Sequence, residues 1–195
     1  MAHTKSRSEP IRDPSKVLAI KNTLKSEASP RDYLLFVLGL NTALRLRDLL
    51  ALRVGDVIDS RGRVRNAICP RQSGLPTLRG KLNASCRDAL RYYISETKPE
   101  DREALLFCST EPNRPMSRTQ VWRLINEWCH AAGLVDGRYG SHTLRKTWGY
   151  MALKHCSIPI GSIQAKYHHA TPGVTKRYLG VEGDKIDNVE AFVNL

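Results

Sequence analysis

Residues 141–151 read SHTLRKTWGYM, and this short stretch carries much of the information in the chain. Ser141 is a suitable N-cap, so a helix is expected from there to about His155. Residues three apart share a helix face, which would place the His142 imidazole beside the Arg145 guanidinium. An arginine fork matches the oxygens of a phosphate, and a neighbouring histidine can move a proton. Taken alone, such a pair more often consists of solvent-exposed side chains on a basic helix, without a catalytic role.

The segment around this helix is rich in cations and contains a candidate nucleophile. From residue 137 to residue 181 the sequence has no aspartate or glutamate. Tyr178 lies near the end of this segment, nine residues after His169. A phenol titrates near pH 10, so a nucleophilic tyrosine needs a positive field or a base beside it. The alternative is a core tyrosine whose hydroxyl is satisfied by a neighbour.

A further arginine lies upstream, in the run NTALRLRDLL of residues 41–50. Arg45 follows an apolar helix after a short break, which indicates a side chain aimed inward rather than at solvent. The alternative is a structural ion pair between Arg45 and Asp48, three residues later.

The overall charge points to a polyanionic partner. The chain has 195 residues, with 31 Lys and Arg against 19 Asp and Glu, for a formal net charge of +12. Residues 61–91 hold eight basic side chains and a single carboxylate. Two long stretches nearly free of carboxylate favour a surface shaped for phosphates over a merely solvated one.

Other features exclude several classes of protein. No apolar run reaches the length of a membrane span and the N-terminus lacks the apolar stretch of a signal peptide, so a cytoplasmic protein is expected. The pairs Cys129-His130 and His155-Cys156 have a spacing that fits no compact zinc site, so no metal site is predicted.

Caps and apolar periodicity predict a mainly α-helical domain with a small antiparallel β-sheet, an α+β class. Residues 1–12 are expected to be a loose arm, and residues 13–195 a single domain. Helix starts are predicted after the caps Asp13, Ser29, Asn83, Ser117 and Thr171, with further helices over residues 46–52, 141–155 and 159–167. Gly55 is expected to end the helix of residues 46–52. Two strands are predicted around a turn within residues 56–68, and a hairpin arm over residues 71–82.

Three motifs together resemble the catalytic domain of the tyrosine recombinase, or phage integrase, family. The family's first arginine motif, of the kind T-G-L-R-[IL]-x-[ED]-L-L-x-L, is similar to residues 42–52, and its H-x-L-R-[HK]-T motif to residues 142–147. Its [GN]-H-S-S-x-x-x-T-x-x-Y motif resembles residues 168–178, with His169, Thr175 and Tyr178 in register. The resemblance covers roughly residues 15–190 and implies the tyrosine recombinase catalytic-domain fold.

The resemblance implies a site-specific recombinase or integrase that cleaves and rejoins DNA through a 3′-phosphotyrosyl intermediate. Tyr178 would attack the phosphodiester, and Arg45 and Arg145 would hold its non-bridging oxygens. His142 would shuttle the proton, and His169 would donate a hydrogen bond to the same phosphate. Asp48 would support the arginine. The family stores the bond energy in the protein–DNA link, so no metal and no cofactor is expected.

The implied partner is double-stranded DNA, on which the family implies a homo-oligomeric assembly, a tetramer on paired sites. Further DNA contacts are predicted for five basic residues: Arg71, Arg79, Lys81, Lys146 and Arg177. No membrane partner is expected.

The chain departs from the family pattern at the general acid. A lysine in a K-T-G context normally protonates the departing 5′-oxygen, and Gln72 stands where that lysine belongs. Three interpretations stay open: Arg71 substitutes despite its high pKa, Lys81 reaches the site through a shifted register, or the acid is absent and cleavage is slow. His168 also stands where glycine or asparagine is usual.

A second departure concerns the N-terminus, because only about forty residues precede Arg45 and the family's separate core-binding domain is not among them. The chain is then a minimal recombinase, a fragment, or a protein that borrows DNA contacts from an accessory partner. Two other functions stay open: a topoisomerase-like DNA-relaxing enzyme, and a non-catalytic DNA-binding protein that keeps the fold.

Overall fold

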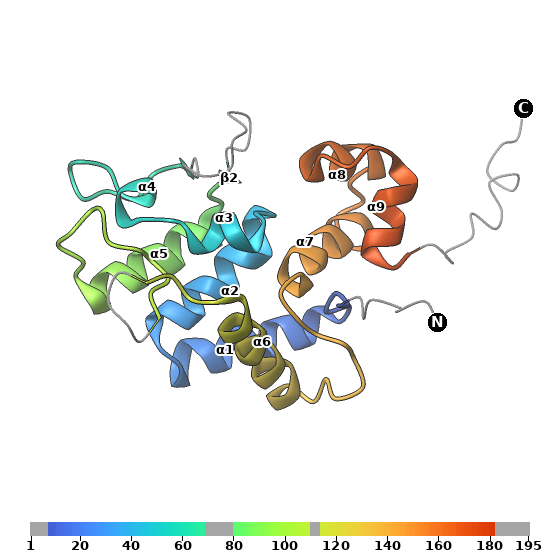
Figure 1. Cartoon of the computed structure of the whole chain (residues 1–195), viewed down its shortest axis with the longest axis horizontal. Coiled ribbons are helices and arrows are strands. Elements are labelled where there is room, and N and C mark those ends of the chain that lie inside the picture. Colours follow the sequence, from blue (N-terminus) through green and yellow to red (C-terminus); the bar gives the residue numbers. More distant parts are fainter. Residues whose placement is uncertain (1–7, 69–79, 110–113, 182–195) are drawn as a thin grey trace, which may run out of the picture.

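The computed structural model describes residues 8–68, 80–109 and 114–181. Its elements follow in chain order (Figure 1): α1 (Pro14–Glu27), α2 (Pro30–Thr42), α3 (Leu46–Leu50), α4 (Val54–Val57), β1 (Ala67–Ile68), β2 (Gly80–Lys81), α5 (Ala84–Thr97), α6 (Arg118–Ala131), α7 (Thr143–Lys154), α8 (Ile160–Tyr167) and α9 (Pro172–Leu179). The predicted class, mainly helical with a small antiparallel sheet, is confirmed. None of the helices in these ranges is both long enough and apolar enough to cross a bilayer.

Side-chain caps start five of the helices where the sequence predicts them. Each cap accepts a hydrogen bond from a backbone N–H of the first turn, and the caps are Asp13, Ser29, Asn83, Ser117 and Thr171. Ser117 and Gln120 form the predicted reciprocal capping box at α6, with hydrogen bonds of 3.1 and 2.7 Å. These bonds satisfy amide groups that a helix end otherwise leaves unpaired.

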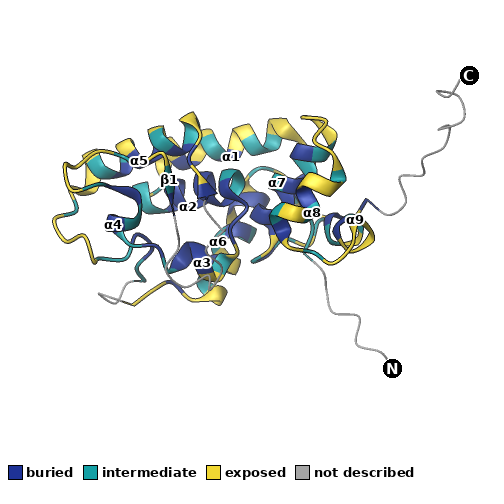
Figure 2. Ribbon diagram, turned by 90° about the horizontal axis from the view of Figure 1, so that it is seen from above, coloured by how far each residue is buried: buried dark blue, intermediate teal, exposed yellow. Residues whose placement is uncertain are grey.

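Helix α2 is the centre of the main hydrophobic core. Its residues 33–38 are all buried, and α1, α3, α5 and α7 pack around it. A helix that is apolar on every side must be enclosed in this way. Helix α7 comes especially close, since a Cβ added to Gly39 would lie 2.5 Å from Leu144 Cδ1. In Figure 2 the dark blue of α2 lies inside, while α1 shows a yellow exposed face.

A smaller hydrophobic cluster joins α7, α8 and α9. Its fully buried members include Ile163, Tyr167 and Leu179, and Ala43 at the end of α2 joins it. Figure 1 shows these three helices, orange to red, together on one side of the molecule. The residues between the two clusters are those that line the candidate site.

Of the strand, turn and strand predicted within residues 56–68, the turn and a short second strand are confirmed, but the predicted first strand is wrong. Residues 54–57 are helical, Ile58 and Val64 form only an isolated bridge, and β1 pairs antiparallel with β2 in the register Ala67↔Lys81. Asp59 explains the turn, because its carboxylate accepts hydrogen bonds from the backbone N–H of Arg61 and Arg63.

The expectation that Gly55 ends a helix is also wrong. The helix begun at Leu46 stops at Leu50, and Gly55 lies inside the next helix, α4. There a Cβ would lie 3.1 Å from the backbone oxygen of Arg102. This glycine therefore serves a close backbone approach rather than a helix end.

Residues 8–12, expected as part of a loose arm, are instead held against α7 and α9. The Ile11 side chain is fully buried, and its N–H donates to Thr147 Oγ1 at 2.8 Å. Arg12 donates to the Gly180 oxygen at 3.1 Å and stacks over Tyr150. Residues 1–7 lie outside the described ranges.

Candidate functional site

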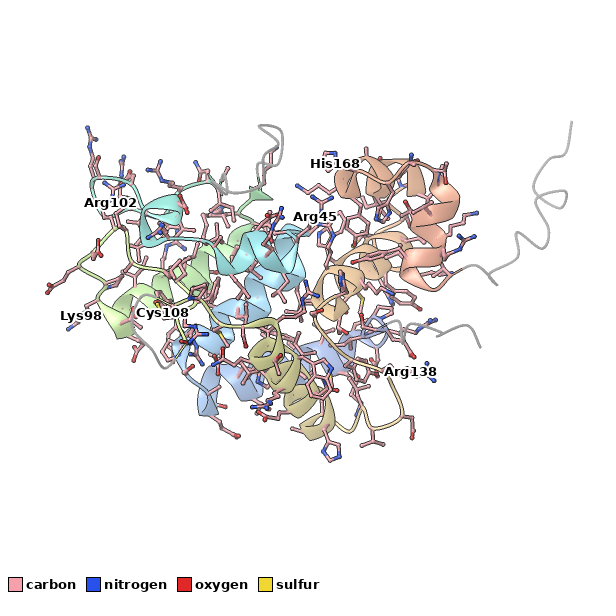
Figure 3. All side chains as sticks on the ribbon, viewed as in Figure 1. Arg45, Lys98, Arg102, Cys108, Arg138 and His168 are labelled. Atoms are coloured by element: carbon pink, nitrogen blue, oxygen red, sulfur yellow. The ribbon has the colours of Figure 1, made fainter. Side chains whose placement is uncertain are left out.

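The five predicted catalytic residues come from four separate parts of the chain and line one hollow. Arg45 is the N-cap of α3, His142 is the N-cap of α7, and Arg145 lies in the first turn of α7. His169 lies between α8 and α9, and Tyr178 lies in α9. All five line the same cavity of about 710 Å³, here called the phosphate hollow. In Figure 3, Arg45 lies at the start of α3, on the side that faces α8.

The helix predicted over residues 141–155 starts two residues later than expected, at Thr143. Residues 141–142 form a turn. His142 is therefore the N-cap and Arg145 the third residue of the helix. These two positions lie on the same side of a helix start, and both side chains line the phosphate hollow.

Arg145 is buried, and two helix C-termini hold its guanidinium. Its Nη1 donates to the Ala43 oxygen at the end of α2, and its Nη2 donates to the Tyr167 oxygen at the end of α8, at 3.3 Å. The guanidinium carbon lies 4.4 Å from the Tyr167 ring centroid. Helix C-termini carry partial negative charge and an aromatic face attracts a cation, so these contacts stabilise the buried charge. They do so without a carboxylate among the described residues, which leaves the charge available to an anion.

Both carbonyls that Arg145 binds lie at left-handed turns. Ala43 has φ of 56°, and His168, which follows Tyr167, also has φ of 56°. The family patterns quoted above have glycine at the first position and glycine or asparagine at the second. Those residues adopt left-handed backbone at low cost, whereas other side chains meet a steric penalty there. Ala43 and His168, which replace the family's usual residues, therefore occupy positions where the fold, not the chemistry, favours glycine.

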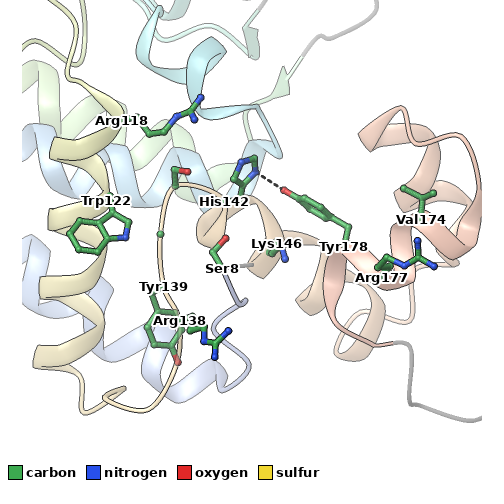
Figure 4. Close-up of a pocket in the computed structure, with 12 residues that line it drawn as sticks. Ser8, Arg118, Trp122, Arg138, Tyr139, His142, Lys146, Val174, Arg177 and Tyr178 are labelled. Atoms are coloured by element: carbon green, nitrogen blue, oxygen red, sulfur yellow. Dashed lines mark hydrogen bonds between the residues drawn. The ribbon is translucent and has the colours of Figure 1, made fainter. Parts of the chain in front are cut away.

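Tyr178 and His142, the predicted nucleophile and its predicted proton acceptor, are in contact and are here called the reactive pair. The Tyr178 hydroxyl lies 3.3 Å from His142 Nδ1 (Figure 4). Loss of water around the ring raises the pKa of Tyr178, and the nearby guanidinium groups of Arg145 and Arg45 oppose that rise. Loss of water also lowers the pKa of His142, and Lys146, Arg118 and Arg145 lower it further by repulsion. A neutral His142 can therefore accept the tyrosine proton.

Thr175 orients the second histidine. Its Oγ1 lies 3.0 Å from His169 Nδ1 and 3.4 Å from the Thr171 oxygen. The hydroxyl has one proton, which it donates to the Thr171 oxygen, so it accepts a hydrogen bond from the His169 Nδ1–H. A ring held in this way can donate from Nε2 to an anionic ligand when it carries the second proton.

The predicted support of Arg45 by Asp48 is not what the structure has. Asp48 is fully buried, and its carboxylate lies 3.5 Å from Nε of Arg47. Within the described ranges neither of its oxygens has a hydrogen bond. Arg45 itself is exposed and lines the phosphate hollow without an ion pair among the described residues.

The predicted DNA-contacting residues are dispersed. Lys146 is buried, with its ammonium 4.9 Å from the Tyr178 ring centroid, so it lies beside Tyr178 rather than on an outer surface. Arg177 is exposed and lines a neighbouring hollow. Lys81 is exposed in β2 and lines neither described hollow. Arg71 and Arg79 lie outside the described residues, as does Gln72.

Sequence reasoning missed Arg118, which lines the phosphate hollow from the first turn of α6. A signal for it exists. A cation in the first turn opposes the helix dipole, so an arginine directly after the Ser117 cap indicates an anionic ligand rather than helix stabilisation.

Comparisons with known proteins bear on this geometry. A sequence model of the phage integrase family matches residues 13–183. The chain is 33% identical over 177 residues to the probable integrase/recombinase YoeC of Bacillus subtilis (strain 168), an alignment that covers 90% of this chain and 91% of that protein.

Two solved structures share the fold. The crystal structure of XerA recombinase has a TM-score of 0.68 and 19% identity, over 92% of this chain and 61% of that one. The XerH site-specific recombinase, in a post-cleavage complex with palindromic difH substrate, has a TM-score of 0.63 and 20% identity, over 88% and 48%. The chain thus spans less than two thirds of the length of either solved protein.

Proposed function

Because the chain belongs to the phage integrase family, the tyrosine recombinases, we propose that it binds double-stranded DNA and cleaves and rejoins its strands through Tyr178. One observation carries the proposal: Tyr178, two arginines and two histidines from separate motifs line a single hollow. A phosphodiester in that hollow would meet the nucleophile and the cations together.

The proposed reaction follows from the contacts of each group. The Tyr178 oxygen attacks the phosphorus and gives its proton to His142 Nδ1, which lies 3.3 Å away. The bond between the Tyr178 oxygen and phosphorus forms as the bond to the 5′-oxygen breaks, which leaves a 3′-phosphotyrosyl link. The departing 5′-oxygen becomes a hydroxyl by taking a proton from Lys81, from Arg71 or, if the protein supplies no acid, from water. Arg45 and Arg145 stabilise the negative charge that builds on the non-bridging oxygens. Rejoining reverses these steps with a 5′-hydroxyl as the attacking group.

The proposal is tested by covalent capture of DNA. The protein is incubated with a library of randomised nicked duplexes, denatured, and examined for DNA that stays attached, whose ends are then sequenced. We expect adducts at a preferred sequence with wild-type protein and none with Tyr178→Phe. Tight, salt-sensitive binding without any adduct across the library would overturn the strand-transfer proposal in favour of a non-catalytic DNA-binding protein. Adducts with relaxation of supercoiled plasmid, but no exchange between two sites, would identify a relaxing enzyme.

The proton donor for the 5′-oxygen can be identified with a sulfur leaving group. A thiol has a pKa near 8.5 and leaves without a proton, whereas an alkoxide needs one. A duplex with sulfur at the 5′-bridging position should therefore be cleaved faster than its oxygen counterpart if the acid is absent. If Lys81 is the acid, Lys81→Gln slows only the oxygen substrate, and Arg71→Gln does the same if Arg71 is the acid.

A further inference from the structure

A second hollow adjoins the phosphate hollow on the other side of the reactive pair. It has a volume of about 610 Å³, within the range of small-molecule sites. The two hollows share four lining residues: Arg118, Ser141, His142 and Tyr178. Figure 4 shows Arg118 and Trp122 on α6 across from Val174 and Arg177 on α9, with His142 and Tyr178 between them. A linear polymer bound in one hollow can therefore extend into the other.

The second hollow has an aromatic wall that is firmly held. Trp122 is 49% exposed, a high value for the largest side chain. A Cβ added to Gly140 would lie 3.0 Å from Trp122 Cδ1, so the edge of the indole packs against the backbone of the loop between α6 and α7. Asn126 Nδ2 donates to the backbone oxygens of Trp122 and Tyr139, at 2.7 and 3.0 Å, and ties α6 to the same loop. The indole is thus fixed in place while half of it stays open.

The electrostatics of the second hollow select an anion. Its lining includes Arg118, Arg138 and Arg177, and no carboxylate is among its described residues. Neither Arg118 nor Arg138 has an ion pair in the part of the chain that the structure describes. An open indole beside several cations is the chemistry that binds single-stranded nucleic acid, where bases stack on aromatic rings and arginines hold phosphates.

We propose that the second hollow binds an unpaired nucleotide of the DNA strand, with its base against Trp122 and the phosphates on either side of it on Arg118 and Arg138. The inference deepens the proposed function and rests on it for the identity of the strand. A base inside a duplex has both faces covered by its neighbours, so a duplex could use the cations but not the indole. A nucleotide next to the cleaved phosphate must leave its duplex when strands exchange, and the second hollow adjoins the position of that phosphate.

Fluorescence titration with a single-stranded thymidine octanucleotide tests this proposal. Stacking on the indole should quench tryptophan emission in a saturable way, and Trp122→Phe should abolish that quenching. Trp122→Ala should weaken binding roughly tenfold, and Trp122→Phe less, because phenylalanine still offers a ring to stack on. Trp148→Phe is the matched control, because the Trp148 ring packs 5.6 Å from Tyr167 within the smaller hydrophobic cluster and should not contact the ligand.

Quenching that persists in Trp122→Phe, or binding that is unchanged in Trp122→Ala, would overturn the proposal. So would equal quenching by a blunt duplex of the same length, which would indicate a backbone-binding surface. Covalent capture on nicked duplexes keeps the two proposals apart. Adducts without Trp122-dependent quenching would support strand transfer and rule out the nucleotide site. Trp122-dependent quenching without adducts would support the nucleotide site and rule out strand transfer.

Discussion

At the residue scale, the Thr175 hydroxyl accepts a hydrogen bond from His169 Nδ1–H, because its own proton goes to the Thr171 oxygen. Thr175→Val keeps the buried shape but removes the 3.0 Å contact with Nδ1. The Nδ1–H then loses its acceptor, which disfavours the protonated ring that would donate from Nε2 to a phosphate. We expect adduct formation to slow roughly tenfold, equivalent to about 1.4 kcal/mol in the barrier. Single-turnover adduct formation on a nicked duplex measures this.

The matched control is Thr175→Ser, which keeps the hydroxyl and should keep most of the rate. DNA affinity should change little in either variant, since Thr175 is buried. A valine variant as fast as wild type would show that the contact between Thr175 and His169 does not limit the reaction.

The protonation of His142 predicts the pH dependence. Its pKa is lowered by loss of water and by three nearby cations, so the ring stays neutral below the usual titration point of about 6.5. Adduct formation should therefore persist at mildly acid pH and fall only as His142 becomes protonated and can no longer accept the tyrosine proton. The pKa of His169 is also lowered, by burial and then by Arg145 and Arg45.

Single-turnover rates against pH check this assignment. The acid limb should remain in His169→Gln and should be absent from the residual activity of His142→Ala; the opposite pattern would transfer the base role to His169. Both folded-state pKa values lie below the unfolded ones, so folding disfavours the protonated rings. The free energy of unfolding should accordingly decrease as pH falls through about 6.5 and below.

Much of the site could be predicted at this scale, and its support could not. The motifs place Arg45, Arg145 and Tyr178 in one hollow, as the resemblance implies. The sequence does not reveal that Arg145 is buried and held by the carbonyls of Ala43 and Tyr167, because those contacts are long-range and use backbone atoms. Backbone oxygens are present at every residue, so a pattern of side chains cannot single them out.

At the element scale, the helix starts with side-chain caps were predicted well and the strands poorly, for a physical reason. A cap such as Asn83 or Thr171 acts through a bond to an amide two or three residues away, so its signal is local. The strand β1 has two residues and depends on β2, twelve residues further along the chain. The Asp59 turn between the predicted strands is held by its own side chain, so alternation in residues 56–68 does not report a sheet.

The end of α8 predicts a gain in stability. His168 is exposed and left-handed, with φ of 56°, and it contributes no packing to either hydrophobic cluster. Left-handed backbone costs an ordinary residue about 1–2 kcal/mol, part of which glycine returns as unfolded-chain entropy. We expect His168→Gly to raise the free energy of unfolding by about 0.5–1 kcal/mol, measured in denaturant.

Ala43→Gly is the matched contrast. It relieves the same backbone conformation but removes a methyl group that is 1% exposed and packs within the smaller cluster. Its gain should be smaller or negative. An equal gain in both variants would mean that burial of the Ala43 methyl contributes nothing.

The close packing of α7, α8 and α9 predicts that a larger residue at Gly149 lowers the free energy of unfolding. A Cβ on Gly149 would lie 2.3 Å from the Tyr167 hydroxyl oxygen and 2.8 Å from Leu179 Cδ2. Both neighbours are fully buried, so Gly149→Ala must push these helices apart, at a cost of about 1–3 kcal/mol. Because Tyr178 lies beside Leu179, adduct formation should fall as well.

Gly161→Ala provides the control within α8, since nothing lies within 4 Å of a Cβ at that position. A helical glycine without such contacts should gain up to about 1 kcal/mol on becoming alanine. Thermal unfolding and adduct formation are compared in both variants. If Gly149→Ala were as stable and as active as Gly161→Ala, the close packing of the three helices would not position the nucleophile.

At the scale of the whole molecule, the site lies where the two hydrophobic clusters meet, and the start of the chain crosses between them. Ile11 belongs to the larger cluster, while Arg12 binds the C-cap oxygen of α9, which belongs to the smaller one. Thr143, at the start of α7, also donates to the Glu9 oxygen at 2.8 Å. Residues 8–12 thus connect the helix that carries Arg145 with the helix that carries Tyr178.

The charge of the whole molecule predicts steep salt dependence of DNA binding. Five arginines around the two hollows are exposed, and four of them, Arg45, Arg118, Arg138 and Arg177, are candidates for binding phosphate because Arg47 lies 3.5 Å from the Asp48 carboxylate. Each phosphate that a cation neutralises contributes about −0.9 to the slope of log affinity against log salt. If these four each bind one phosphate, the slope should be about −3.6 or steeper. Arg138→Gln should make it shallower by about 0.9, because one counterion fewer is released.

Lys25→Gln separates this local effect from that of net charge. Lys25 is an exposed cation of α1 that lines neither hollow, so its removal changes the net charge by the same amount as Arg138→Gln. Fluorescence anisotropy with a labelled duplex, at a series of salt concentrations, gives the three slopes. Equal slopes for wild type and Lys25→Gln, with a shallower one for Arg138→Gln, would place the DNA backbone along the hollows. Equal changes of slope in both variants would mean that the protein binds DNA through its overall charge and that the hollows are not the DNA-binding surface.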